Sequence, residues 1–137
     1  MSINEIQNQI VEEFSPLKDS LDKYKYLINL AKNLEPLNDE YKKSENSIQG
    51  CQSNAWVVTS IMNNKMLLKG DVDVMITKGI LSLLLRVYNN QNVSEIADSD
   101  LYFLEKIGLK NSLSPQRANG VRAIVEHIKT VAKRNIE

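Results

Sequence analysis

The stretch from Ala55 to Lys69 restricts the fold most, because it has the pattern of a β-hairpin in a chain otherwise patterned for helices. Residues 55–62 are rich in β-branched and apolar side chains and predict a buried strand. Asn63-Asn64 tolerates the positive φ angles of a two-residue turn, and residues 65–69 then return as the antiparallel partner. An isolated hairpin is marginally stable, so we expect a third strand near residues 41–47, or the helices, to complete the sheet.

Apolar residues recur at helical spacing on both sides of this hairpin. They predict helices at residues 3–14, about 19–34, 72–89 and 115–134, and shorter helical pieces at 93–97 and 101–107. Residues 72–89 are apolar almost all round and predict a central buried helix, with Asp71 and Asp73 capping its N-terminus. Gly120, inside the last helix, predicts a close contact with another backbone or with the sheet.

These elements predict an α+β fold in which a small antiparallel sheet of about three strands packs against several helices. The 137 residues suit one domain covering 1–137, because a chain of this size can bury a core without disulfide or metal.

The composition excludes several classes of protein. Lysine plus arginine and aspartate plus glutamate both total 17, so no basic field favours binding to nucleic acid. No stretch approaches 18 consecutive apolar residues, and the N-terminus lacks a basic region followed by an apolar run. We therefore expect no membrane association and a cytoplasmic protein whose single thiol stays reduced.

Cys51 is the only cysteine, and its neighbours favour a chemical role. A lone cysteine is most often a small buried hydrophobe, and this alternative stays open. Cys51, however, lies before the apolar strand and follows Gly50, which permits unusual backbone angles and leaves space at the thiol. The other neighbours are turn-forming or hydrogen-bonding residues: Asn46, Ser47, Gln49, Gln52, Ser53 and Asn54. This pattern is typical of a thiol presented on a loop.

A single cysteine also limits the chemistry. An iron-sulfur scaffold or a zinc site would need three or four Cys or His ligands, and the chain has Cys51 and His127, far apart in sequence. A dithiol redox protein would need a second cysteine. A cysteine hydrolase would need a base beside the nucleophile, and we expect His127 to be a surface or boundary residue of a helix. We predict no cofactor and no metal.

The sequence resembles the SufE family of sulfur-acceptor proteins, on motifs that extend over most of the chain. These motifs are Gly50-Cys51-Gln52-Ser53 before Trp56, Gly70-Asp71-x-Asp73, Lys78-Gly79, and Leu113-Ser114-Pro115-x-Arg117-x-Asn119-Gly120. They agree with the family in order and spacing, most clearly from Ser47 to Gly120.

The resemblance implies a SufE/IscU-like fold and work beside a pyridoxal-phosphate cysteine desulfurase in iron-sulfur cluster assembly. In the family, the desulfurase strips sulfur from L-cysteine as a persulfide on its own cysteine, and the carrier's thiolate takes the outer sulfur. Cys51 would thus become a persulfide, stimulate a SufS-like desulfurase and supply a SufBCD-like scaffold complex. The resemblance also points to a homodimer, and it makes Gly50, Gln52 and Arg117 candidates for loop or partner contacts.

The family's chemistry makes further demands on the loop. A persulfide is labile to reductants, so a family-like site should hold it in an apolar pocket, and a loop from about residue 47 to 53 should swing out on docking. We expect Trp56 between sheet and helix, or as a wall of that pocket. Lys42 and Lys43 would favour the thiolate if they folded towards Cys51, although lysines in a polar loop are usually solvated.

Three other functions stay open. The chain could be a paralogous carrier serving a different desulfurase, as CsdE-like proteins do. It could be a thiol-dependent enzyme acting without a protein partner. It could also be an interaction module whose cysteine is structural.

Overall fold

The computed structural model describes residues 1–51, 53–109 and 113–136. Its elements are α1 (Ile3–Phe14), α2 (Ser20–Asn33), the 3-10 helices η1 (Asp39–Tyr41) and η2 (Ser44–Asn46), β1 (Ala55–Met62), β2 (Lys65–Val72), α3 (Met75–Tyr88), β3 (Gln91–Asn92), α4 (Val93–Asp98), α5 (Phe103–Lys106) and α6 (Pro115–Arg134). The strands form one antiparallel sheet in the order β1-β2-β3. The predicted α+β fold, with a small sheet packed against several helices, is confirmed.

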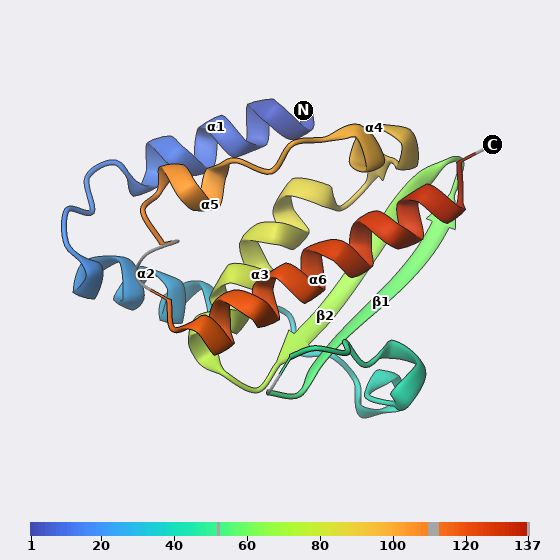
Figure 1. Cartoon of the computed structure of the whole chain (residues 1–137), viewed down its shortest axis with the longest axis horizontal. Coiled ribbons are helices and arrows are strands. Elements are labelled where there is room, and N and C mark those ends of the chain that lie inside the picture. Colours follow the sequence, from blue (N-terminus) through green and yellow to red (C-terminus); the bar gives the residue numbers. More distant parts are fainter. Residues whose placement is uncertain (52, 110–112, 137) are drawn as a thin grey trace.

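Helix α3 runs through the middle of the molecule, and the other elements surround it (Figure 1). It contacts α1, α2, α6 and β2, and nine of its 14 residues are buried. Gly79 permits the close crossing with α2, because a Cβ atom at this position would overlap the backbone carbonyl of Leu27. The prediction of a central buried helix is therefore confirmed, although the helix begins at Met75 and not at Val72.

The hairpin has the turn that its sequence predicts. Asn63 and Asn64 have φ angles of 54° and 65°, in the left-handed region that asparagine tolerates better than most residues. The strands pair from Met62 with Lys65 to Ala55 with Val72, so β2 is longer than predicted. Its inward side chains meet α3, as expected for a sheet with one face on the core.

The third strand does not lie where the sequence analysis places it. From residues 41–47, only Ser47 forms a bridge, to Trp56. The third strand is instead β3, which pairs with Lys65 and Met66 at the other edge of the sheet. Its two residues are too few to show a strand periodicity, so a turn after the central helix is all that their sequence indicates.

Asp71 does not cap α3, and this prediction was wrong. It lies in β2, 9% exposed, with Lys42 Nζ 3.2 Å from one carboxylate oxygen and Lys78 Nζ 3.1 Å from the other. The amide N–H of Val72 also donates to Asp71, at 2.9 Å. Asp73 is no cap either: it accepts a hydrogen bond from the Asn54 side chain at 2.9 Å. Asp71 thus has charged donors, and Asp73 bonds a side chain of the loop and not the first turn of α3.

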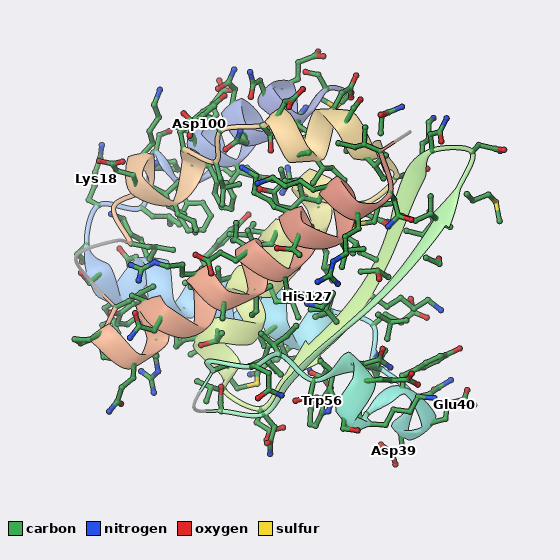
Figure 2. The ribbon with its side chains drawn as sticks, turned by 45° about the vertical axis from the view of Figure 1, so that its right-hand side comes forward. Lys18, Asp39, Glu40, Trp56, Asp100 and His127 are labelled. Atoms are coloured by element: carbon green, nitrogen blue, oxygen red, sulfur yellow. The ribbon has the colours of Figure 1, made fainter. Side chains whose placement is uncertain are left out.

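Trp56 lies on the strand face opposite to its buried neighbours Ala55 and Val57, and not between sheet and helix as predicted. Strand alternation explains this position, because successive side chains point to opposite faces. Figure 2 shows Trp56 beside the segment that carries Asp39 and Glu40. Lys42 Nζ lies 5.3 Å from the centre of the indole ring, which adds a cation–π contact to its ion pair.

The ion pairs of Asp71 should make the stability of the protein depend on pH. Burial opposes its ionisation, but hydrogen bonds from Lys78 and Lys42 outweigh burial and hold the pKa of Asp71 below its ordinary value. A carboxyl group of this kind stabilises the fold above its unfolded pKa, and the contribution disappears as pH falls through the folded pKa. Asp71→Asn should therefore lower the free energy of unfolding at pH 7 by about 2 kcal/mol, measured by urea denaturation.

The matched control is Asp39→Asn, because Asp39 also lies near Lys42 Nζ, at 3.9 Å, but its side chain is fully exposed. It should change stability little. The difference in the free energy of unfolding between Asp71→Asn and the wild type should be smaller at pH 3 than at pH 7. An equal gap at pH 7 and pH 3 would contradict an electrostatic origin.

Candidate functional site

The loop that carries Cys51 is anchored at both ends by backbone hydrogen bonds. On one side Ile48 is buried, and its N–H donates to the carbonyl of Ala55 at 2.9 Å. On the other side the carbonyl of Asn54 accepts from the N–H of Asp73 at 3.0 Å. The thiol is thus held between η2 and β1, beside the end of β2 that leads into α3.

Two glycines allow the loop to lie against α6. Gly50 has a φ angle of +88°, which L side chains rarely adopt. Gly120, in α6, faces the thiol: a Cβ atom there would lie 2.9 Å from Cys51 Sγ. The sequence analysis predicts a close contact at Gly120, but its partner is the cysteine side chain and not backbone or sheet. Helix α6 therefore leaves out a side chain at the point where the thiol packs.

The thiol opens into a cavity of about 300 Å³. Its walls are formed by Cys51, Ser53, Val74, Thr77, Gln116, Arg117 and Gly120. Thr77 and Gly120 are buried and form the floor, whereas Gln116 and Arg117 are exposed at the rim. Cys51 Sγ lies 3.3 Å from Ser53 Oγ, a hydrogen bond in which either atom can donate. The cavity is mixed in character, and not the purely apolar pocket that the family's chemistry leads us to expect.

Arg117 lines the cavity, whereas Gly50 precedes Cys51 in the loop and faces Ala123 of α6. Arg117 is at the third position of α6, where its backbone N–H donates to Ser114 Oγ at 3.3 Å. Ser114 caps this helix and Pro115 is its first residue, as predicted. Gln52, the remaining candidate, lies outside the described residues.

Other residues considered from the sequence do not line the cavity. Lys42 pairs with Asp71 and Lys43 with Glu45, and Trp56 faces away from α3. His127 lies on α6 (Figure 2). By its sequence position it is about two helical turns further along than Gly120. Burial, with a smaller contribution from Arg134, lowers its pKa. The cavity therefore places no histidine base beside the thiol.

The sequence analysis missed three wall residues: Val74, Thr77 and Gln116. Thr77 belongs to the first turn of α3, where a threonine is unremarkable in sequence. Its polar side chain is no signal by itself, because α3 also contains a lysine, a serine and an arginine. Nothing in the sequence alone brings this turn to Cys51.

Neither a metal cluster nor a membrane-spanning helix occurs among the described residues. Within 1–51, 53–109 and 113–136, no three or more His, Cys, Asp and Glu side chains gather closely enough to hold a metal ion. Over the same part of the chain, no helix combines the length and apolar character needed to cross a membrane.

Comparison with known proteins agrees with the resemblance seen in the sequence. Residues 8–132 match the family model SufE, described as an Fe-S metabolism associated domain. An uncharacterized SufE-like protein of Rhizobium etli is 39% identical over 92% of this chain and 88% of its own length. A second, from Synechocystis, is 35% identical over 90% of this chain and 78% of its own length.

A solved structure shows the same fold. The solution structure of a hypothetical protein from Thermus thermophilus aligns with a TM-score of 0.75 at 18% identity, over 94% of each chain. At this level of identity the likeness concerns the fold alone.

The contact between Gly120 and the thiol leads to a prediction. Gly120→Ala would put a methyl group 2.9 Å from Cys51 Sγ, so the thiol must move away from the floor of the cavity. Its rate of alkylation by iodoacetamide in the native protein should rise severalfold. Stability should change little, because alanine is favoured over glycine in a helix by about 1 kcal/mol, which offsets the displacement.

Gly79→Ala is the matched control, since it also adds a methyl group to a helical glycine. There the neighbour is the Leu27 backbone, which cannot move aside as a side chain can. This variant should lower the melting temperature and leave the alkylation rate of the folded protein unchanged. If Gly120→Ala alkylates at the wild-type rate, the thiol is not held against α6 in solution.

Proposed function

The chain belongs to the SufE family, and we propose that it accepts sulfur from a pyridoxal-phosphate cysteine desulfurase onto Cys51 and carries it to an iron-sulfur scaffold. The observation that supports this most is the position of Cys51, a half-buried thiol over Gly120 at the edge of a cavity with an open rim. A thiol placed in this way can be reached by a partner and can hold an added atom.

The transfer step needs no external oxidant or reductant. The thiolate of Cys51 attacks the outer sulfur of the persulfide on the desulfurase, and a new sulfur–sulfur bond forms on Cys51. The bond between the two sulfurs of the desulfurase breaks, and its electron pair stays on the desulfurase cysteine as a thiolate. The proton on the outer sulfur travels with it, so atoms and charge balance.

The chain's own residues have separate parts in this step. The clamped loop, with Ile48 paired to Ala55, limits the positions that the thiol can take. Gly120 provides room behind the sulfur. Arg117 and Gln116, exposed at the rim, are placed to contact a protein that brings its cysteine to the cavity. The loop opens on docking so that the two sulfurs can meet.

The partners follow from the same proposal. A SufS-like desulfurase donates the sulfur and is stimulated by its removal, and a SufBCD-like scaffold complex receives it. The family resemblance also points to a homodimer. A carrier for a different desulfurase would use the same thiol and the same cavity, so the identity of the partner has to be tested directly.

Intact-mass analysis tests the transfer. The protein is mixed with an active cysteine desulfurase and L-cysteine, with Cys51→Ser in parallel. The wild-type chain should gain about 32 Da, one sulfur atom, and lose it again on addition of a reductant. Cys51→Ser should gain nothing. Failure to gain the mass with several active desulfurases would refute the carrier function.

Arg117→Ala tests the role of the rim. It should slow sulfur transfer from the desulfurase about tenfold or more, because an exposed arginine at a contact surface is a frequent source of binding energy. Loading of Cys51 by a small polysulfide should not change. Arg122→Ala, also exposed on α6 but outside the cavity wall, is the control and should transfer at the wild-type rate. Equal slowing with both sulfur sources would assign Arg117 to the thiol and not to the partner.

A further inference from the structure

Thr77 is a buried polar residue whose side chain has no hydrogen-bond partner among the described residues. Four non-aromatic polar side chains of this part of the chain are buried: Gln7, Asp71, Thr77 and Gln91. Gln7 bonds Asp100, Tyr102 and Phe103, Asp71 pairs with two lysines, and Gln91 donates to Met1. Thr77, at 2% exposure, has no such partner, and it lines the Cys51 cavity. Its hydroxyl oxygen is nevertheless not fully enclosed, because among the described residues Tyr88 Oη is the enclosed side-chain atom without a partner.

The hydroxyl of Thr77 therefore borders open space, and the space that Thr77 lines is the Cys51 cavity. A hydroxyl group at the wall of a cavity forms its hydrogen bonds with whatever occupies that cavity. Around Thr77 the helix and the sheet supply no such partner in the described residues. The cavity is thus the source of a partner for this hydroxyl, either water or a bound group.

The occupant that the chemistry of Cys51 brings there is a second sulfur atom. A cavity of about 300 Å³ has ample room for one more sulfur beyond Sγ. The outer sulfur of an ionised persulfide carries negative charge, which is costly to bury without hydrogen-bond donors. Ser53 Oγ already lies 3.3 Å from Sγ, the inner sulfur. Gln116 and Arg117 are exposed at the rim, where solvent weakens their influence.

We infer that the hydroxyl of Thr77 donates a hydrogen bond to the outer sulfur of a persulfide on Cys51 and so retains the sulfur in the cavity. This inference rests on the proposed function, since it concerns the sulfur that Cys51 accepts. It assigns Thr77 as a sulfur-binding residue in the floor, distinct from the rim residues that would meet a partner.

The test loads the sulfur without any desulfurase. A soluble polysulfide transfers one sulfur atom to the Cys51 thiolate and leaves a polysulfide shorter by one atom, and intact mass verifies the loading. Cyanide then attacks the outer sulfur and releases thiocyanate, which restores the Cys51 thiolate. Thr77→Val, which keeps the shape and removes the hydroxyl, should lose the sulfur about tenfold faster, as expected for one hydrogen bond to a charged group.

The pH dependence separates sulfur binding from a structural role. A donor to the ionised sulfur lowers its pKa, so the midpoint of the pH profile for cyanide release should lie about one unit higher in Thr77→Val. Thr77→Ser, which keeps the hydroxyl, should behave like the wild type. Thr130→Val, on an exposed part of α6, controls for the substitution itself.

Each outcome decides the inference. If folded Thr77→Val releases sulfur at the wild-type rate and with the wild-type pH midpoint, the inference is overturned. The hydroxyl of Thr77 would then bond to water in the cavity. Faster loss in both Thr77→Val and Thr77→Ser would also overturn it, because packing and not the hydroxyl would then be responsible. Failure of Cys51 to take up sulfur from polysulfide would overturn it as well. If Cys51 takes up sulfur from polysulfide but not from desulfurases, the result counts against the proposed function. The polysulfide measurements on Thr77 would still test the inference.

Discussion

Burial of α3 on almost every side is the constraint on which the rest of the structure depends. Its apolar side chains cover most of its circumference, so helices and sheet must each supply a face to cover them. Two glycines make this possible: Gly79 lies against the backbone of Leu27, and Gly70 of β2 leaves room for Leu81 and the carbonyl of Trp56. Because close-packed interiors resist small displacements, the first turn of α3 has a fixed position relative to β2 and α6. The cavity is built on that turn.

The site forms where three segments meet: the loop with Cys51, the start of α3 and the start of α6. Asp71 links two of them from outside the cavity. Lys42 belongs to the segment that leads to the loop, and Lys78 follows Thr77 in α3, and both bind the same carboxylate. These ion pairs join the loop segment to the helix and lie away from the thiol. The residues that contact the thiol directly are small or neutral: Ser53 and Gly120.

A sulfur carrier has two conflicting requirements, since the sulfur must be shielded from reductants and still be accessible to a second protein. Under the proposed function, the cavity meets both requirements, because it has a buried floor and an exposed rim. Under the proposed function, Thr77 and Gly120 hold the sulfur, and Arg117 and Gln116 meet the partner. This division also explains why the mixed lining suits the chemistry better than an apolar one: a charged sulfur in an apolar pocket would have no donor.

The sequence by itself determined the features whose signals lie in neighbouring residues. The turn at Asn63-Asn64, the start of α6 at Ser114-Pro115, the buried α3 and the family motifs around Cys51 are all of this kind, because turn and cap preferences act over a few residues and periodicity over one element. The tertiary structure alone decided the third strand, the ion pairs of Asp71, the contact of Gly120 with the thiol and the place of Thr77 in the cavity. Each of these features depends on which distant segment packs against a given face of a helix or strand. The periodicity of apolar residues shows only that the face is buried, and not which segment buries it.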